Sequence, residues 1–473
     1  MSEPLDLLSH FPPVTDRDWE KLIPENLNWY PIEGITVRPY YRRGKPTPNH
    51  IFSHREWLIR ADVEVRDAVR AQLAGAEALG FSLSEEDVRL PKDLPIGTIP
   101  LFFRGRGATP KLLETLRIRA ASNGYAPEEL RGAVDISSEY PVYQILDMAK
   151  GTRLWTLCIS LEPWHEQGAT HVQELACALA QLSEHLAEAG SGFATEHLYF
   201  TVPVGERYLL DIARLRALRL GAAAVLDAYK VRSQKVNIVG IPSRRYESAL
   251  DPDTHLIRRT LQCVAAILGG CDVIAAPDAD LGLQMQQLMR HEGRLGVAAD
   301  AAAGAWIIEY LTDALGAASW QLFQQIEKTG GLDRSLHWIE KQIQQTRSQR
   351  NAAVHSGADV VVGVNTYLSP EIPQVDPYPD GLAGPLEAIR IRAKALMKKP
   401  QVEVRGEQDP WLRRLLSLCS CDIQNQSANI RIAKTPTGFT AQNTRGEQIS
   451  LTSGDPLHLA ADQLLGLFDS DAA

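Results

Sequence analysis

The chain has 473 residues, of which 44% are hydrophobic and 23% are charged, and its net charge is −9. This is the composition of a globular protein with a large core, and the acidic balance argues against a nucleic-acid partner, which would require a basic surface. No window approaches the length of uncharged apolar sequence that a membrane span needs, so the sequence predicts no membrane partner.

The N-terminal 50 residues form a Pro-rich arm with little periodicity. Such an arm cannot bury its own aromatic side chains, and we expect it to wrap another surface. Its opening stretch, MSEPLDLLSH, has neither a basic segment nor an apolar one, so we expect no secretory signal and a cytoplasmic location. The aromatic residues of the arm are Phe11, Trp19, Trp29, Tyr30, Tyr40 and Tyr41.

Between residues 51 and 355, short β-rich runs alternate with helical patterns. The clearest helix is expected over 170–189, where apolar residues recur at helical spacing. The eight expected strands are 57–63, 76–83, 98–103, 132–137, 154–161, 198–204, 235–241 and 272–277. Eight βα units of this length predict a (β/α)8 barrel. The alternative, a doubly wound open sheet, usually carries a Gly-rich phosphate turn, and RGRGATP (104–110) has only two of its three glycines.

The segment 356–400 is predicted to be a Pro-rich connector followed by a helix. Residues 401–473 are predicted to contain a helix, a hairpin-like stretch and a last helix. The six cysteines form no C-x-x-C pair and several lie in apolar runs, which indicates buried thiols in a reducing compartment. They are Cys158, Cys177, Cys263, Cys271, Cys419 and Cys421.

Two histidine-containing stretches resemble known functional motifs. In HEQGATH, His165 and His171 are six positions apart, whereas a metal-binding helix places its histidines four apart, so we interpret them as surface or loop-packing residues. DTHLIRR (253–259) resembles the start of the cobalt-ligand loop D-x-H-x-x-G, but the Gly position is Arg258. We expect Asp253 or Thr254 to cap a helix there instead, with its end at one of the glycines 269–270.

Long segments of the chain resemble the barrel of the methylmalonyl-CoA mutase family, over roughly residues 12–400. The N-terminal FPPVTDRDWEKLI and EGITVRPYYRR resemble the small subunit of that family in particular. The segments that carry the resemblance are 168–190, 211–225, 255–283, 294–332 and 362–370.

The resemblance implies a radical carbon-skeleton rearrangement of methylmalonyl-CoA to succinyl-CoA, for which adenosylcobalamin supplies the radical. It implies an acyl-CoA chain along the barrel axis, lined by small polar side chains, and a separate cobalamin domain over the C-terminal mouth of the barrel. In the small subunit, it implies an N-terminal arm that helps to hold the partner.

The segment ISLEPWHEQGAT (159–170) departs from the catalytic pattern of the family. Catalytic members end a strand with G-Y-H-x-Q-E-A-G-A, and the His there hydrogen-bonds the thioester carbonyl. Aligned on the following Gly-Ala, that His falls at Pro163, which has no donor, whereas His165 takes the place of the Gln and Glu166 matches the Glu. A two-residue loop shift would bring His165 back to the acid's place. We therefore expect no catalytic residue here, with His165 and Glu166 as vestigial candidates.

Other positions implied by the resemblance also differ. PTPNHIFSH (46–54) lacks the Tyr that drives the cofactor toward cleavage. Leu250 replaces a Gln that contacts substrate, and Ala279 replaces a Glu that contacts the deoxyadenosyl group. Arg244 and Arg245 stand where small residues line the substrate channel.

The segment 401–473 is too short for a cobalamin domain and contains no D-x-H-x-x-G. The expected fold is thus a (β/α)8 barrel with an N-terminal extended arm and a short C-terminal α/β appendage, with no complete cobalamin-binding domain. We expect this chain to bind no cofactor, and adenosylcobalamin to reside in the partner.

Three functions remain open from the sequence. The first is a non-catalytic small subunit that forms a heterodimer with a catalytic methylmalonyl-CoA mutase large subunit. The second is an active acyl-CoA mutase barrel of the isobutyryl-CoA type with a separate cobalamin-binding subunit. The third is a barrel re-tasked to other chemistry, with Arg244, Arg245, His165 and Glu166 as its site. Whether acyl-CoA still binds is left open.

Overall fold

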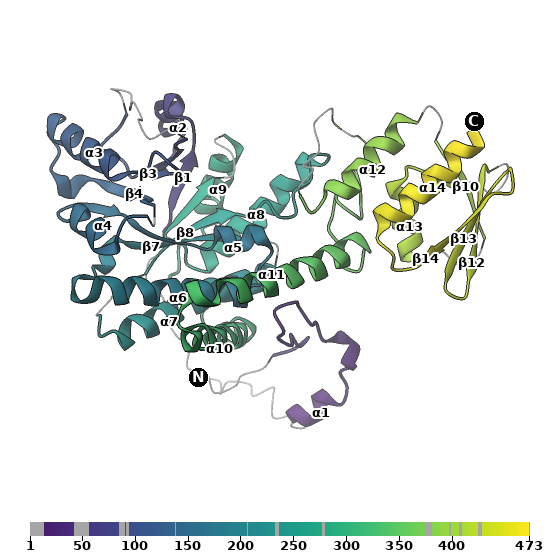
Figure 1. The fold of residues 1–473 in the computed structure, drawn as a ribbon, viewed down its shortest axis with the longest axis horizontal. Coiled ribbons are helices and arrows are strands. Elements are labelled where there is room, and N and C mark those ends of the chain that lie inside the picture. Colours follow the sequence, from purple (N-terminus) through teal and green to yellow (C-terminus); the bar gives the residue numbers. More distant parts are fainter. Residues whose placement is uncertain are drawn as a thin grey trace, which may run out of the picture.

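The computed structural model describes residues 14–41, 56–84, 90, 94–137, 139–205, 207–231, 236–276, 280–369, 371, 373, 381–396, 399–405, 409–423 and 428–472. Along these residues an N-terminal arm, a barrel, a connector and a C-terminal lobe follow one another, and the lobe projects from one side of the barrel (Figure 1). Phe11, Ala279 and the stretch 46–54 lie outside the described residues.

The barrel sheet consists of parallel strands in the order β5-β4-β3-β2-β1-β9-β8-β7-β6. Its two ends, β5 and β6, are halves of one chain segment separated by Thr156, so the chain itself closes the ring. Counting that segment once gives eight strands, all at the predicted places, and the (β/α)8 prediction is confirmed. The strands are β1 (Leu58–Asp62), β2 (Ala78–Ser82), β3 (Leu101–Arg104), β4 (Arg131–Val134), β5 (Arg153–Trp155), β6 (Leu157–Ser160), β7 (Leu198–Val204), β8 (Asn237–Pro242) and β9 (Val273–Ala276).

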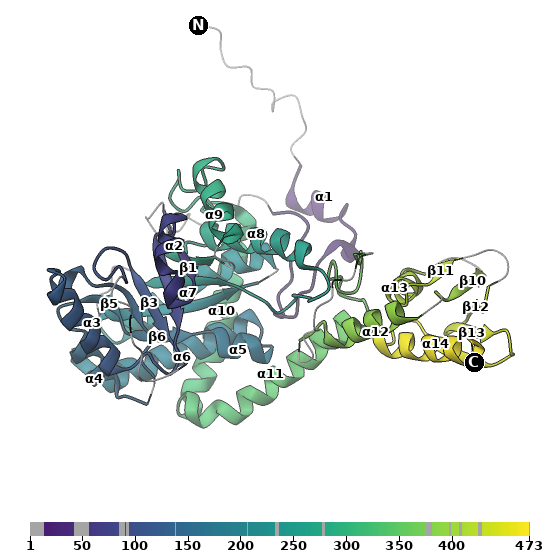
Figure 2. The same cartoon turned by 90° about the horizontal axis from the view of Figure 1, so that it is seen from above.

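Helices cover the outside of this sheet, as seen from two directions in Figures 1 and 2. The helix expected over 170–189 is confirmed as α6. The barrel-side helices are α2 (Ala68–Leu73), α3 (Pro110–Ser122), α4 (Val142–Ala149), α5 (Glu162–Gln167), α6 (His171–Ala189), α7 (Tyr208–Ala228), α8 (Pro252–Leu268), α9 (Leu281–His291), α10 (Trp306–Thr329) and α11 (Leu332–His355).

The start of α8 differs from the prediction. Its N-cap is Asp251, whose side chain accepts from the backbone N–H of Thr254 at 3.4 Å, so the expectation of a cap at Asp253 or Thr254 was wrong. Pro252 takes the first helical position, where its missing N–H costs nothing. The predicted end is confirmed, because Gly269 is the C-cap.

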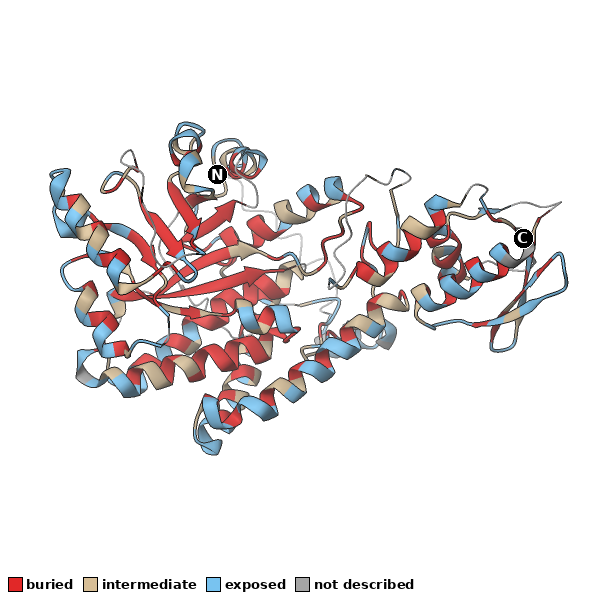
Figure 3. Cartoon of the chain, turned by 45° about the horizontal axis from the view of Figure 1, so that its top comes forward, coloured by how far each residue is buried: buried red, intermediate tan, exposed pale blue. Residues whose placement is uncertain are grey.

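Side chains alternate between the two faces of the barrel strands. Outward residues such as Ile59, Phe103 and Phe200 join the main core beneath the helices, and Figure 3 shows the strands as buried almost throughout. Inward residues form a separate cluster on the barrel axis that includes Phe102 and Tyr199.

The C-terminal lobe contains a five-stranded sheet in the order β11-β10-β12-β13-β14. The predicted hairpin is confirmed as β12 paired antiparallel with β13, whereas β10 and β11 were not expected. Only β11, β10 and β12 run parallel. The lobe and connector consist of α12 (Gly384–Ala395), β10 (Gln401–Arg405), α13 (Pro410–Leu418), β11 (Asp422–Ile423), β12 (Ile430–Thr435), β13 (Gly438–Asn443), β14 (Gln448–Thr452) and α14 (Leu457–Ala472).

The described part of the arm (14–41) contains one short α-helix, α1 (Asp16–Glu20), and a 3-10 turn at Glu25–Leu27. Its second half lies on the barrel helices, since the Tyr310 hydroxyl donates to the carbonyl of Thr36 at 3.0 Å and the rings of Tyr41 and Tyr310 are 5.0 Å apart. Among the helices in the described part of the chain, none combines the length and apolar character needed to cross a membrane.

Helix α7 is buried on several sides and carries three buried arginines, each paired with an acid. Arg214 pairs with Glu174 and Asp211, Arg216 with Asp300 and Glu309, and Arg219 with Asp272. A buried charge is tolerated only when its partner is present, so these pairs fix α7 against its neighbours.

We predict that Arg216→Leu lowers the free energy of unfolding by about 3–5 kcal/mol, because it leaves the carboxylates of Asp300 and Glu309 buried without their cation. Urea unfolding followed by circular dichroism measures the change. The matched control is Arg413→Leu on α13, where the side chain is exposed. Equal losses in the two variants would contradict the role of the buried pair.

Candidate functional site

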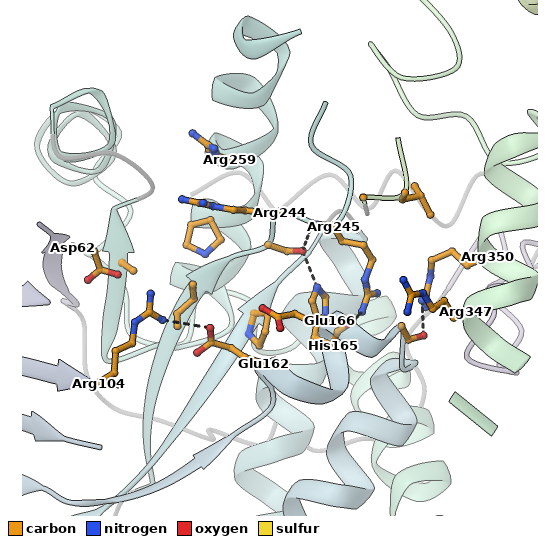
Figure 4. A pocket seen from close by; sticks show the side chains of 18 of the residues that line it. Asp62, Arg104, Glu162, His165, Glu166, Arg244, Arg245, Arg259, Arg347 and Arg350 are labelled. Atoms are coloured by element: carbon orange, nitrogen blue, oxygen red, sulfur yellow. Dashed lines mark hydrogen bonds and ion pairs between the residues drawn. The ribbon is translucent and has the colours of Figure 1, made fainter. Parts of the chain in front are cut away.

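A cavity of about 530 Å³ opens at the carboxyl ends of the barrel strands, and we call it the mouth cavity. In parallel barrels, this is the face at which functional residues gather. Helix α11 and residues 381–382 form the opposite wall. Figure 4 labels the charged lining residues and His165, which are Asp62, Arg104, Glu162, His165, Glu166, Arg244, Arg245, Arg259, Arg347 and Arg350.

His165 is held at the mouth cavity by hydrogen bonds from both ring nitrogens. It lies on the short helix α5, which Gly168 ends in the left-handed conformation. Its Nδ1 is 2.8 Å from Oε1 of Glu174, and its Nε2 is 2.7 Å from Oγ of Ser243. Because Glu174 can only accept, Nδ1 carries the proton and Nε2 accepts from the Ser243 hydroxyl.

The pKa values of this network keep the imidazole neutral. Burial, with the positive charge of Arg245 as a further cause, lowers the pKa of His165 to about 4. The guanidinium of Arg214 and the imidazole of His165 hold the pKa of Glu174 far below its usual range, against the effect of burial. A neutral imidazole whose one proton is already donated to Glu174 has no donor left for a ligand.

The structure brings together the predicted candidates His165, Glu166, Arg244 and Arg245 around one cavity. His165 is buried, so of the two expected roles, surface or loop packing, only the packing one agrees with the structure. The reason is that α5 turns its ring inward, where Glu174 and Ser243 satisfy both nitrogens.

The structure also shows where Pro163, Leu250 and His171 lie. Pro163 is exposed on α5, and Leu250 is fully buried. His171, expected to be a surface or loop-packing residue, is buried, with Nδ1 3.6 Å from Glu33 of the arm and Nε2 3.6 Å from Asp211. Within the described residues, no group of three or more His, Cys, Asp and Glu side chains is arranged to hold a metal ion.

The barrel axis below the mouth cavity is filled by aromatic rings. The rings of Phe102 and Trp155 are 5.8 Å apart, and those of Trp155 and Tyr199 are 5.7 Å apart. The guanidinium of Arg60 lies 5.2 Å from the centre of the Phe102 ring and pairs with Asp62 at 2.7 Å. We call these four residues, Arg60, Phe102, Trp155 and Tyr199, the axial plug.

Cavities lie on both sides of the axial plug. A lower cavity of about 540 Å³ lies at the amino ends of the strands, with Phe102 and Trp155 in its wall. Between it and the mouth cavity is a hole of only about 30 Å³, lined by Arg60, Phe102 and Tyr199 among others. Such a hole has room for only a few water molecules, and the rings of the axial plug lie between the two large cavities.

Sequence reasoning missed several residues of the site, namely Ser243, Glu174, Arg347 and Arg350. Ser243 follows β8 directly, which is a position where barrel residues reach the mouth, and that signal was available. Glu174, Arg347 and Arg350 lie on helices where a charged residue normally indicates a solvated face, so the sequence offered no comparable signal.

We predict that His165 makes the protein more stable as pH rises from about 4 to 6.5. Its pKa is about 4 in the folded chain against an ordinary value of 6.5, so the unfolded chain binds more protons in this range. The contribution, about 3 kcal/mol, is complete above pH 6.5 and lost as pH falls through about 4. Urea unfolding measured across this range should show a smaller rise with pH for His165→Gln than for the wild type.

The matched control is His291→Gln on α9, whose side chain is exposed. It should leave the pH profile of the wild type unchanged. Parallel profiles for His165→Gln and the wild type would show that the buried imidazole does not titrate as inferred.

The chain matches the family model described as methylmalonyl-CoA mutase over residues 84–379. A methylmalonyl-CoA mutase small subunit of Porphyromonas gingivalis is 24% identical over 450 residues, which cover 76% of this chain and 71% of the relative. A small subunit of Streptomyces virginiae is 25% identical over 495 residues, with 86% and 78% covered. The methylmalonyl-CoA mutase of Rhizobium meliloti is 24% identical over 456 residues, with 75% and 64% covered.

Among solved structures, a dihydropteroate synthase of Coxiella burnetii is similar with a TM-score of 0.32 and 10% identity, covering 57% of this chain and all of that one. A likeness this weak supports no functional conclusion. The family match extends over more than half of the chain and includes most of the barrel. This protein therefore belongs to the methylmalonyl-CoA mutase family.

Proposed function

We propose that this chain is the non-catalytic small subunit of a heteromeric, adenosylcobalamin-dependent methylmalonyl-CoA mutase. It supports a catalytic large subunit, which carries the cofactor and interconverts methylmalonyl-CoA and succinyl-CoA. The names of two relatives, both small subunits, support this assignment.

The observation that carries the proposal is the axial plug. The family's acyl-CoA chain is expected to run along a barrel axis lined by small side chains, whereas Phe102, Trp155 and Tyr199 occupy the axis here. The remaining hole of about 30 Å³ is too small for a thioester arm. An acyl group therefore has no route along the axis between the lower cavity and the mouth cavity.

The geometry of the mouth supports the same proposal. Pro163 stands where the family's carbonyl-polarising His is expected, and it has no N–H. His165 is near, but its Nδ1 proton goes to Glu174 and its Nε2 accepts from Ser243. Neither residue offers a hydrogen-bond donor to a thioester carbonyl.

The residues of the C-terminal lobe do not fit a cobalamin-binding domain of the doubly wound type, in which the strands run parallel. Strand β13 pairs antiparallel with both β12 and β14. This arrangement supports a location of adenosylcobalamin, the source of the radical in this family, in the partner chain.

The arm presents an exposed apolar surface suited to a partner. Leu22 is 74% exposed, Tyr30 is 66% exposed and Trp19 is 40% exposed. The rings of Trp19 and Tyr40 are 5.0 Å apart, so these two exposed side chains lie together. Exposed apolar patches of this kind mark interfaces.

We predict that the full chain forms a heterodimer with a catalytic methylmalonyl-CoA mutase chain from the same organism, detected by light scattering after size exclusion. The double variant Trp19→Asp, Leu22→Asp should weaken pairing by roughly tenfold or more, because burying either new carboxylate at an apolar interface is costly. Circular dichroism should remain that of the wild type, since both side chains are exposed on the arm.

Leu73→Asp serves as the control, because Leu73 is 85% exposed on α2 and outside the arm. It should leave pairing unchanged. A full chain that stays alone in the presence of the catalytic chain would overturn the proposed function, and an unaffected double variant would overturn the role of the arm.

A second prediction concerns the number of substrate sites. We expect the assembled complex to bind one methylmalonyl-CoA per heterodimer by calorimetry, because the plugged barrel contributes no site. Ser243→Ala in this chain should leave turnover within about threefold, which is less than 1 kcal/mol of barrier. Two sites per heterodimer, or a hundredfold loss of turnover, would instead indicate an active barrel that uses a separate cobalamin-binding subunit.

A further inference from the structure

The charge of the mouth cavity is opposite to that of the whole chain. Its described lining residues include six arginines and three carboxylates, although the chain carries a net charge of −9. His165 adds no charge, because burial and Arg245 keep its imidazole neutral. The cavity is therefore a local concentration of positive charge.

Four of the six arginines are committed to the protein itself. Arg104 pairs with Glu162 at 3.4 Å, and Arg259 pairs with Glu247 at 2.6 Å. Arg350 donates to the carbonyl of Gly168 at 2.6 Å, and Arg245 donates to the carbonyl of His165. These four hold the walls of the cavity in place.

Arg244 and Arg347 differ from these four arginines in their contacts. Across the residues that the structure describes, no hydrogen bond or ion pair engages the guanidinium of either. Both side chains are exposed and line the cavity. In Figure 4, Arg244 lies on the side of Arg259 and Arg347 lies beside Arg350 on the other side, so the two guanidiniums come from opposite walls.

The backbone fixes where these two arginines stand. The N–H of Ser243 donates to the carbonyl of Val204 at 2.8 Å, which continues the β8 pairing up to the residue before Arg244. On the other wall, Gly168 lies so close to α11 that a Cβ there would come within 2.7 Å of the Arg347 Cβ. The absence of a side chain at 168 thus allows α11 to bring Arg347 to the cavity.

The carboxylates of the cavity do not cancel this charge. Asp62 pairs with Arg60 at 2.7 Å and Glu162 pairs with Arg104. Glu166 is the remaining acid of the described lining. Two uncommitted guanidiniums thus face a single uncommitted carboxylate.

We infer that the mouth cavity binds a small dianion with phosphate or carboxylate groups, and that Arg244 and Arg347 bind it from opposite walls. Guanidinium groups recognise both kinds of anion through paired N–H donors. The cavity volume of about 530 Å³ suits a small organic ligand. This site does not depend on the proposed pairing with a catalytic subunit, because all of its residues belong to this chain.

Calorimetric titration of the full chain at low salt tests the inference, with pyrophosphate as the phosphate probe and glutarate as the carboxylate probe. We expect at least one of them to bind with a Kd below roughly 1 mM. Tighter binding of pyrophosphate assigns the site to phosphates, and tighter binding of glutarate assigns it to carboxylates. Arg244→Gln and Arg347→Gln should each weaken binding by roughly tenfold or more, and the double variant should abolish it.

The control is Arg334→Gln, an exposed arginine on the same helix as Arg347 but outside the cavity. It should keep the wild-type Kd within about twofold, as expected for a charge remote from the site. Thermal melts of all variants establish that they are folded. If neither probe binds with a Kd below about 1 mM, or if the folded double variant binds as well as the wild type, the inference is overturned.

Discussion

The constraint on which the rest of the structure depends is the alternation of side chains in a closed eight-stranded barrel. Every second residue of each strand points to the axis, and the space there is fixed by the ring of strands. The sizes of a few inward side chains therefore decide whether the axis is a channel or a core. With Phe102, Trp155 and Tyr199 inward, the axis is filled as a core, and a cavity of about 30 Å³ lies among these side chains.

The side chains on the axis lie between the mouth cavity at the carboxyl ends of the strands and the lower cavity at their amino ends. An open channel would join these two cavities. The lower cavity is walled in part by the apolar rings of Phe102 and Trp155, whereas the mouth cavity is lined by arginines and acids. The plug also contains charge, since Arg60 and Asp62 pair at its upper edge. A ligand at the mouth consequently meets a closed floor, and its recognition depends on the residues of the rim.

The barrel was predictable from sequence because buried parallel strands are apolar on both faces and stand out as short continuous runs. All eight runs were found, and even the split of one run into β5 and β6 at Thr156 left its position unchanged. The strands β10 and β11 were missed. β11 has only two residues, both exposed, and β10 reads as a short mixed stretch of charged and apolar residues.

The site was less predictable, because its contacts join residues that lie far apart in the chain. His165 was singled out from a local motif, but its burial depends on Glu174, one turn into α6, and on Ser243, 78 residues away. A surface or loop-packing position was expected, and no sequence signal indicated a buried partner on another element. Arg347 illustrates the same limit, since only the closeness of Gly168 to α11 brings it to the cavity.

The buried carboxylate of Glu174 links the mouth to the helices behind it. One oxygen accepts from His165, the other accepts from Arg214, and Arg214 also pairs with Asp211, which lies 3.6 Å from His171. His171 in turn lies 3.6 Å from Glu33 of the arm. The arm therefore lies against the same buried cluster of polar groups that positions His165 at the mouth cavity. The arm and the mouth cavity thus share one buried polar cluster, which extends from Glu33 through His171, Asp211, Arg214 and Glu174 to His165.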